Sequence, residues 1–454
     1  MDSVQFVEEL VKKARAAQAL YETFSQEQVD AAVRALAKAI FDHAEPLARM
    51  AVDETRMGVY EDKVKKNMGK ARVIWNDLKG KKSVGIIRVL EAEGLVEVAK
   101  PIGVVGAVTP TTNPIVTPMC NAMFALKGRN AIIICPHPRA KRSSAEAVRL
   151  MKEAILPMNL PEDIIQIIEE PSVELSGLVM KLCDVCISTG GAGMVKAAYA
   201  SGKPAFGVGA GNVQCLIDED ADIDACVPMI IEGRRFDNGI ICSAEQTAIM
   251  PRKLYDRIMD AFVKNGAAYI SRAEDVAKLR DTLFPGGVMD KFCVGQSAEY
   301  VAQKAGISVP QGTKVLIVKA EGYGMDDLYA KEKMCPVIAA YAYETWEEGV
   351  KIALANLQVE GKGHSVCIHS NNKAHIEYAS SVLPVSRFLI NQICATSNGG
   401  SFFNSLSATT TLGCGSWGNN SISENLSWKH LINVSRIAYV RPGSRMLTDQ
   451  EIWG

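Results

Sequence analysis

The sequence lacks the features of a membrane, secreted or nucleic-acid-binding protein. Its 50 Lys and Arg against 51 Asp and Glu give a formal net charge of −1, so no basic excess is available for nucleic acid or anionic lipid. No apolar run approaches the roughly 20 residues that span a bilayer. Segment 1–9 contains acidic side chains and no basic stretch, unlike a signal peptide. We therefore expect a cytoplasmic protein with no nucleic-acid or membrane partner.

Histidine is scarce, and the cysteines form no framework. Six histidines without metal-ligand spacing argue against a metalloenzyme, and Cys183-Asp-Val-Cys186 lacks the second pair that would complete a zinc site. Several of the twelve cysteines, such as Cys135, Cys215 and Cys367, lie in apolar segments where a thiol acts as a small hydrophobic side chain. This usage is typical of a reducing compartment and predicts no metal site.

The length of 454 residues predicts two or three domains. Helical periodicity fills residues 4–80, whereas 84–101 has the alternation of a β-hairpin. Short apolar strands then alternate with helices over 102–208 and again over 246–390, which predicts an α/β fold with parallel sheets. Segment 391–420 is rich in Gly, Ser, Asn and Thr, as in loops that serve a site.

Glycine-rich turns follow two of the predicted strands. The first is Thr189-Gly190-Gly-Ala-Gly193, and the second is Gly207-Val-Gly-Ala-Gly211. Glycine lets a pyrophosphate approach the backbone, and a helix N-terminus favours its negative charge. The first turn lacks the usual G-x-G-x-x-G spacing, so a plain strand–helix turn stays an alternative.

Cys242 is the cysteine whose surroundings suit a reactive thiol. It follows Phe236-Asp-Asn-Gly-Ile-Ile and precedes a predicted strand at 246–250, which indicates a loop position. A thiol on a loop can act as a covalent nucleophile. The alternative is an ordinary cysteine without a chemical role.

Together these segments resemble the aldehyde dehydrogenase family, in its coenzyme A-acylating branch, and most closely the acylating succinate-semialdehyde dehydrogenases. The resemblance covers nearly the whole chain. Its motifs are Pro110-Thr-Thr-Asn-Pro114, Pro136-His-Pro138, Phe236-Asp-Asn-Gly-Ile-Ile-Cys242, Glu332-Lys-Met-Cys-Pro336, Gly361-Lys-Gly-His364 and Leu412-Gly-Cys-Gly-Ser-Trp-Gly-Asn-Asn-Ser-Ile-Ser-Glu-Asn425.

The resemblance implies two Rossmann-like parallel-sheet domains and a β-hairpin oligomerisation arm. Residues 1–232 would form a cofactor-binding domain that carries the hairpin at about 84–101. Residues 233–420 would form the catalytic domain, and 421–454 a C-terminal return with an oligomerisation strand. A homodimer or homotetramer is expected, because an exposed hairpin is marginal alone.

The resemblance also implies roles for named residues. Cys242 would attack the aldehyde, hydride would pass to NAD or NADP, and coenzyme A would collect the acyl group as co-substrate. Asn113 and the Cys242 amide would stabilise the oxyanion, and His364 would assist coenzyme A unless it is purely structural. Cofactor contacts are expected from Thr109, Pro110, Thr111, Thr112, Asn113, Pro114, Gly190, Gly191, Gly209, Glu332 and Leu412.

The segment Gly207-Val-Gly-Ala-Gly211 contains no carboxylate. Hydrolytic members of the family carry there a Glu that activates water. Without that base, attack of water on an acyl-cysteine should be slow, which favours transfer to coenzyme A.

The polar loop Thr396–Ser405 lies where family members shape the aldehyde pocket, and it predicts an anionic tail on the substrate. The favoured pair is succinate semialdehyde and succinyl-coenzyme A. Sulfoacetaldehyde with sulfoacetyl-coenzyme A, acetaldehyde with acetyl-coenzyme A, and a catalytically silent structural relative stay open. NAD and NADP also stay open, with Arg139 or Lys141 as candidates to meet a 2′-phosphate. Substrate contacts are expected from Thr396, Ser397, Ser401, and Arg234 or Arg387.

Overall fold

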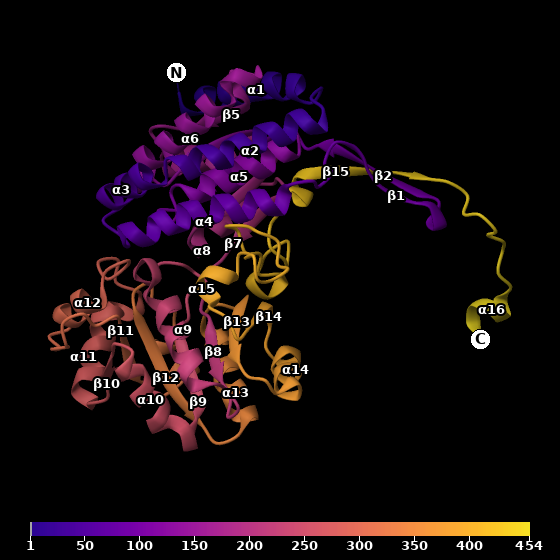
Figure 1. The fold of residues 1–454 in the computed structure, drawn as a ribbon. Coiled ribbons are helices and arrows are strands. Elements are labelled where there is room, and N and C mark those ends of the chain that lie inside the picture. Colours follow the sequence, from indigo (N-terminus) through magenta and orange to yellow (C-terminus); the bar gives the residue numbers. More distant parts are fainter. Residues whose placement is uncertain (1) are drawn as a thin grey trace.

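The computed structural model describes residues 2–454 and contains two parallel sheets and one antiparallel sheet, with helices packed around them (Figure 1). The strands are β1 (Gly85–Leu90), β2 (Leu95–Pro101), β3 (Val104–Thr109), β4 (Ala131–Pro136), β5 (Ile165–Ile167), β6 (Val185–Thr189), β7 (Ala205–Val208), β8 (Gln214–Ile217), β9 (Thr247–Pro251), β10 (Ala267–Ile270), β11 (Val315–Lys319), β12 (Val337–Tyr343), β13 (Gly363–His369), β14 (Val385–Ile390) and β15 (Ile432–Ala438).

The helices alternate with these strands after an all-helical N-terminal segment. They are α1 (Ser3–Tyr21), α2 (Gln26–Asp42), α3 (Ala44–Thr55), α4 (Tyr60–Leu78), α5 (Val116–Lys127), α6 (Lys141–Ile155), α7 (Val173–Leu182), α8 (Ala192–Tyr199), α9 (Ile223–Arg235), α10 (Tyr255–Lys264), α11 (Ala273–Leu283), α12 (Ala298–Lys304), α13 (Trp346–Val359), α14 (Lys373–Val382), α15 (Cys394–Ser397) and α16 (Asp449–Trp453). Among residues 2–454, no helix is both long and apolar enough to cross a membrane.

The N-terminal helices pack on the first sheet because each has one apolar face. In α1 the buried residues Val7, Val11 and Ala14 recur at helical spacing. The helix α2 begins with a capping box in which Ser25 and Gln28 satisfy each other's backbone amides. These apolar faces join β3 and β4 in one hydrophobic core.

The five-stranded parallel sheet has the order of a dinucleotide-binding fold. Its order, β5-β4-β3-β6-β7, runs outward from β3 in both directions, so the strand order reverses between β3 and β6. In open parallel sheets, ligands bind at the carboxyl ends of the strands at this reversal. Thr109 ends β3 and Thr189 ends β6, so the polar turn after β3 and the glycine turn after β6 share that edge.

The seven-stranded parallel sheet, β10-β11-β12-β9-β8-β13-β14, begins earlier than the expected boundary at residue 233. The strand β8 already pairs with β9 and β13, so the chain changes sheets between Val208 and Gln214. The helix α9 also packs in the core of this second sheet. The sequence patterns indicate no strand or helix between 208 and 246, so β8 and α9 were missed and the boundary was placed too far along the chain.

The C-terminal segment returns to the first unit and then joins the arm. Leu426, Trp428 and Leu431 belong to the core of the first unit. The hairpin β1–β2 forms as predicted, and β15 pairs antiparallel with β2. Figure 1 shows this sheet and α16 projecting away from the two parallel-sheet units. The predicted α/β fold with two parallel-sheet units and a hairpin arm is confirmed.

Candidate active site

The site lies where the carboxyl edge of the five-stranded sheet faces the amino edge of the seven-stranded sheet. Residues 209–213 cross from the end of β7 to the start of β8. Gly211 passes so close to the loop before β9 that a Cβ atom there would lie 1.8 Å from the Cys242 carbonyl oxygen. Only glycine fits this approach, so the glycine segment and the loop of Cys242 form one wall.

The loop that carries Cys242 is held by a buried ion cluster. Asp237 and Asn238 both have left-handed backbone conformations, with φ of 51° and 53°. The Asp237 carboxylate bonds Lys63 at 3.1 Å and also Lys66, both on α4. Burial would raise the pKa of Asp237, but the two ammonium groups outweigh it and lower that pKa. The charged carboxylate thus fastens the strained turn that precedes Cys242.

A cavity of about 600 Å³ opens beside Cys242. Ser243 Oγ donates a hydrogen bond of 3.0 Å to the Ala395 carbonyl, which joins the nucleophile loop to the polar loop after β14. The structure therefore brings together predicted site residues from four distant segments. Those in the cavity wall are Asn113, Cys242, Thr396, Ser397, Ser401 and Leu412.

The thiol of Cys242 is held in its protonated form in the ligand-free protein. Burial, and after it the charges of Glu332 and Cys414, raise its pKa to about 12, although Arg387 opposes the shift. Because the thiolate is the reactive form of a cysteine, positive potential near the sulfur would be needed for Cys242 to react at neutral pH.

Glu332 lies beside the contact between Gly211 and Cys242. Burial and the neighbouring Glu360 raise the Glu332 pKa to about 8, although a hydrogen bond from the Gly211 amide opposes the shift. The Glu332 amide itself donates to Glu360 Oε2 at 2.9 Å. At neutral pH this carboxyl group is therefore mostly protonated and a weak base. Its place beside Cys242 fits a contact to a bound cofactor.

His364 is wholly buried at the start of β13, and it does not line the cavity. Burial, and then the charge of Arg387, lower its pKa to about 3, so the ring is neutral. Neither ring nitrogen has a hydrogen-bond partner within the described residues. A buried, unpartnered imidazole is unusual and fits a ligand contact made only on binding.

The two arginines expected to hold the substrate tail do not line the cavity. Arg387 donates to the His364 carbonyl at 2.8 Å and to Ser365 Oγ at 3.2 Å. Arg234 is fully buried, donates to the Cys335 carbonyl, and has a pKa lowered to about 10 by burial. Both guanidinium groups therefore donate to backbone carbonyls outside the lining of this cavity. The expectation is corrected: the cations of the cavity are lysines.

Lys65, Lys66 and Lys70 of α4 line the cavity, and the sequence reasoning missed them. Lys66 is paired with Asp237, and Lys65 is largely exposed. Lys70 Nζ instead donates to the carbonyl oxygens of Gly399 at 3.0 Å and Thr409 at 3.2 Å. Burial lowers the pKa of Lys70 to about 8. The spacing of these lysines along one helix is the feature of the sequence from which they could have been predicted.

The carboxyl edge of the first sheet fits a dinucleotide. A Cβ added at Gly191 or Gly209 would meet no atom within 4 Å, so both glycines border open space. Gly191 is the N-cap of α8, where backbone amides favour a phosphate. Thr109 Oγ1 is buried at the end of β3 and has no hydrogen-bond partner among residues 2–454. These residues suit the pyrophosphate and ribose of NAD or NADP.

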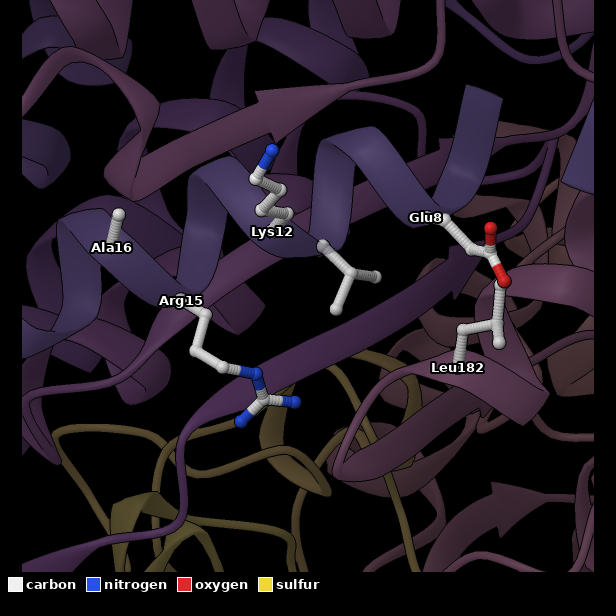
Figure 2. Close-up of a pocket in the computed structure, with 6 residues that line it drawn as sticks. Glu8, Lys12, Arg15, Ala16 and Leu182 are labelled. Carbon is white, nitrogen blue, oxygen red and sulfur yellow. The ribbon is translucent and has the colours of Figure 1, made fainter. Parts of the chain in front are cut away.

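A second cavity, of about 520 Å³, lies at the opposite edge of the first sheet (Figure 2). Arg15 and Lys12 of α1 and Leu182 of α7 line it. Arg15 pairs with Asp184 at 3.0 Å, and Asp184 accepts a bond from the Val104 amide at the amino end of β3. This cavity shares no lining residue with the cavity beside Cys242.

A family model and the most similar known proteins point to the same family. Residues 2–405 match the model of the aldehyde dehydrogenase family. The succinate-semialdehyde dehydrogenase (acetylating) of Clostridium kluyveri is 54% identical over 99% of both chains. The sulfoacetaldehyde dehydrogenase of an Acholeplasma species is 40% identical over 98% of this chain and 93% of its own.

Solved structures agree with these relatives. An acetylating aldehyde dehydrogenase from Geobacillus thermoglucosidasius has a TM-score of 0.94 and 36% identity, with 98% of both chains covered. The propionaldehyde dehydrogenase of Rhodopseudomonas palustris, solved with bound propionyl-CoA, has a TM-score of 0.86 and 27% identity over 96% of this chain and 94% of its own.

Proposed function

Since the chain belongs to the aldehyde dehydrogenase family and is a coenzyme A-acylating aldehyde dehydrogenase, we propose that it interconverts succinate semialdehyde and succinyl-coenzyme A. The family uses NAD or NADP, and either nucleotide suits the glycine-lined edge. The 54% identity to an acylating succinate-semialdehyde dehydrogenase supports this substrate over shorter or uncharged aldehydes.

The position of Lys70 is the main observation that supports an anionic substrate. An ammonium group has three donors, and two of them bond the carbonyls of Gly399 and Thr409. The third is left for a ligand in the cavity that Lys70 shares with Cys242. Hydroxyl groups of Thr396, Ser397 and Ser401 line the same space, so a carboxylate tail would find several donors.

Cys242 is the proposed covalent nucleophile. Its sulfur forms a bond to the aldehyde carbon, and the resulting oxyanion accepts hydrogen bonds from Asn113 and the Cys242 amide. Arg387 stabilises the thiolate through space, since it lowers the pKa of that thiol. Bound NAD or NADP supplies the hydride acceptor in the oxidative direction. The product of this half-reaction is an acyl-cysteine.

Coenzyme A then collects the acyl group. Its thiol attacks the acyl carbon and gives up its proton, and the Cys242 sulfur leaves and takes up that proton. The glycine segment against Cys242 has no carboxylate to activate water, and Glu332 is mostly protonated at neutral pH. Competing hydrolysis should therefore be slow. His364 is the proposed contact for the incoming thiol, since its ring has no partner in the described residues.

A second candidate substrate is sulfoacetaldehyde. Its sulfonate would use the same ammonium group, and a relative of that name is 40% identical. The deciding experiment measures kcat/KM for succinate semialdehyde, sulfoacetaldehyde and propanal on one preparation, with coenzyme A and each nucleotide. We expect succinate semialdehyde to be the best substrate. If propanal equals or exceeds both anions, the anionic class is wrong.

We also propose a homodimer or homotetramer in the cytoplasm. In the part of the chain that the structure describes, β1 pairs only with β2, and Ile86 and Val89 are each 54% exposed, which suits pairing of this edge with another subunit. All twelve cysteines are free thiols, as suits a reducing compartment.

A further inference from the structure

Three metal-ligating side chains meet in the core of the seven-stranded sheet, and the proposed chemistry uses none of them. Cys215 on β8 and Cys367 on β13 are direct partners in the parallel register. His369 lies two residues beyond Cys367, so its side chain is on the same face of the sheet. The two sulfur atoms and one ring nitrogen lie within 4.8 Å of one another, and all three residues are buried.

The separation of the donor atoms suits a metal ion. Cys367 Sγ lies 3.6 Å from His369 Nε2. Zinc bonds of about 2.3 Å to sulfur and about 2.0 Å to nitrogen, set at a tetrahedral angle, place those two ligand atoms about 3.5 Å apart. Cys367 Sγ is also 3.5 Å from the Gln392 carbonyl oxygen, which provides an oxygen near a fourth position.

Simple packing accounts for the thiols but not for the imidazole. A thiol is a small side chain that suits an apolar core. A buried histidine needs hydrogen-bond partners, and the Cys367 thiol that faces His369 Nε2 is a weak one. A metal ion would satisfy the imidazole and both sulfur atoms together.

We propose that Cys215, Cys367 and His369 bind one thiophilic metal ion, zinc or copper(I). Two thiolates and one imidazole are ligands that both ions accept, and binding displaces the thiol protons to solvent. The ion would link β8 to β13 next to Gln392, and Gln392 itself lines the cavity beside Cys242. Its role is to hold that wall in place, without contact to substrate. The inference is independent of which aldehyde the protein uses.

The test is the metal content of the full-length chain. Protein is produced with added zinc or added copper, dialysed with reductant against a weak chelator, and analysed by mass spectrometry for metal per chain. We expect one ion per chain in the wild type and in the matched control Cys183→Ala, a buried thiol of the other parallel-sheet unit. We expect none in Cys367→Ser or His369→Gln. The better-retained metal distinguishes zinc from copper(I).

A second measurement, by absorption spectroscopy, reports on the ligands of the ion directly and so does not depend on metal content alone. Cobalt(II)-loaded wild type should show thiolate-to-cobalt charge-transfer absorption, and Cys215→Ala should lose about half of it, since one of two thiolates is gone. Equal metal content in wild type and Cys367→Ser would overturn the proposal. So would an ion that is lost in Cys242→Ala, or wild type with no more metal than protein from metal-depleted medium.

Discussion

Replacing Lys70 with methionine should remove the preference for an anionic aldehyde while largely sparing propanal. A hydrogen bond to a charged group contributes about 1.5–3 kcal/mol. At 1.36 kcal/mol per tenfold change, its loss lowers kcat/KM for succinate semialdehyde by about 10- to 150-fold. Methionine keeps the length and apolar stem of the side chain, so the packing of α4 against the cavity is preserved.

The measured quantity is the ratio of kcat/KM for succinate semialdehyde to that for propanal. The variant also leaves the Gly399 and Thr409 carbonyls without their donor, and this loss affects both substrates alike. The matched control is Lys65→Met. The Lys65 side chain is 64% exposed at the same cavity, and exposed ion pairs are worth about 0–1 kcal/mol, so its ratio should change less than about fivefold.

The ratio should also depend on pH. Burial lowers the pKa of Lys70 to about 8, and the ammonium form is present below that value. Because kcat/KM reports the free enzyme, the preference for the anion should fall as pH rises through 8. In Lys70→Met the ratio should be flat with pH. A wild-type ratio that is constant from pH 7 to 9, or equal losses for both substrates in the variant, would refute the reasoning.

Four further predictions concern the nucleophile, the product, the neighbouring carboxyl group and the arm. Cys242→Ala should abolish acylation, whereas Cys183→Ala should fold and turn over; appreciable activity of the first variant in a coenzyme A-dependent assay would contradict the assignment. Product analysis should find the thioester with coenzyme A and little free acid without it, and rapid acid formation would argue for hydrolysis. Above pH 8, iodoacetamide should alkylate Cys242 several-fold faster in Glu332→Gln than in wild type, because Glu332 ionises there and raises the pKa of the thiol. Near pH 6.5 the two proteins should react at equal rates. Peptide mass spectrometry follows the alkylation. Deleting residues 84–101 should give aggregate or unstable monomer in light scattering, and a well-folded active monomer would count against the arm.

The local pattern of the sequence was sufficient for much of the fold. Apolar residues recur every two positions in a strand and about every 3.6 positions in a helix, because only one face of the element is buried. The hairpin 84–101 and the strands after residue 102 could therefore be predicted. The glycine turn at Gly190 and the loop of Cys242 were also visible, because turn residues act on the backbone within a few positions.

The sequence by itself thus determined the fold class and the family, and it singled out Cys242 as the proposed nucleophile; it left β8, α9, β10 and α11 unpredicted. Only the tertiary structure decided which distant side chains meet. Lys70 of the N-terminal helices reaches the cavity although it is far from Cys242 in the sequence, whereas Arg234 and Arg387 donate to backbone carbonyls. The register of β8 against β13 likewise brings Cys215 beside Cys367. Such contacts depend on strand order, register and the packing of one sheet against another, which no short window of sequence contains.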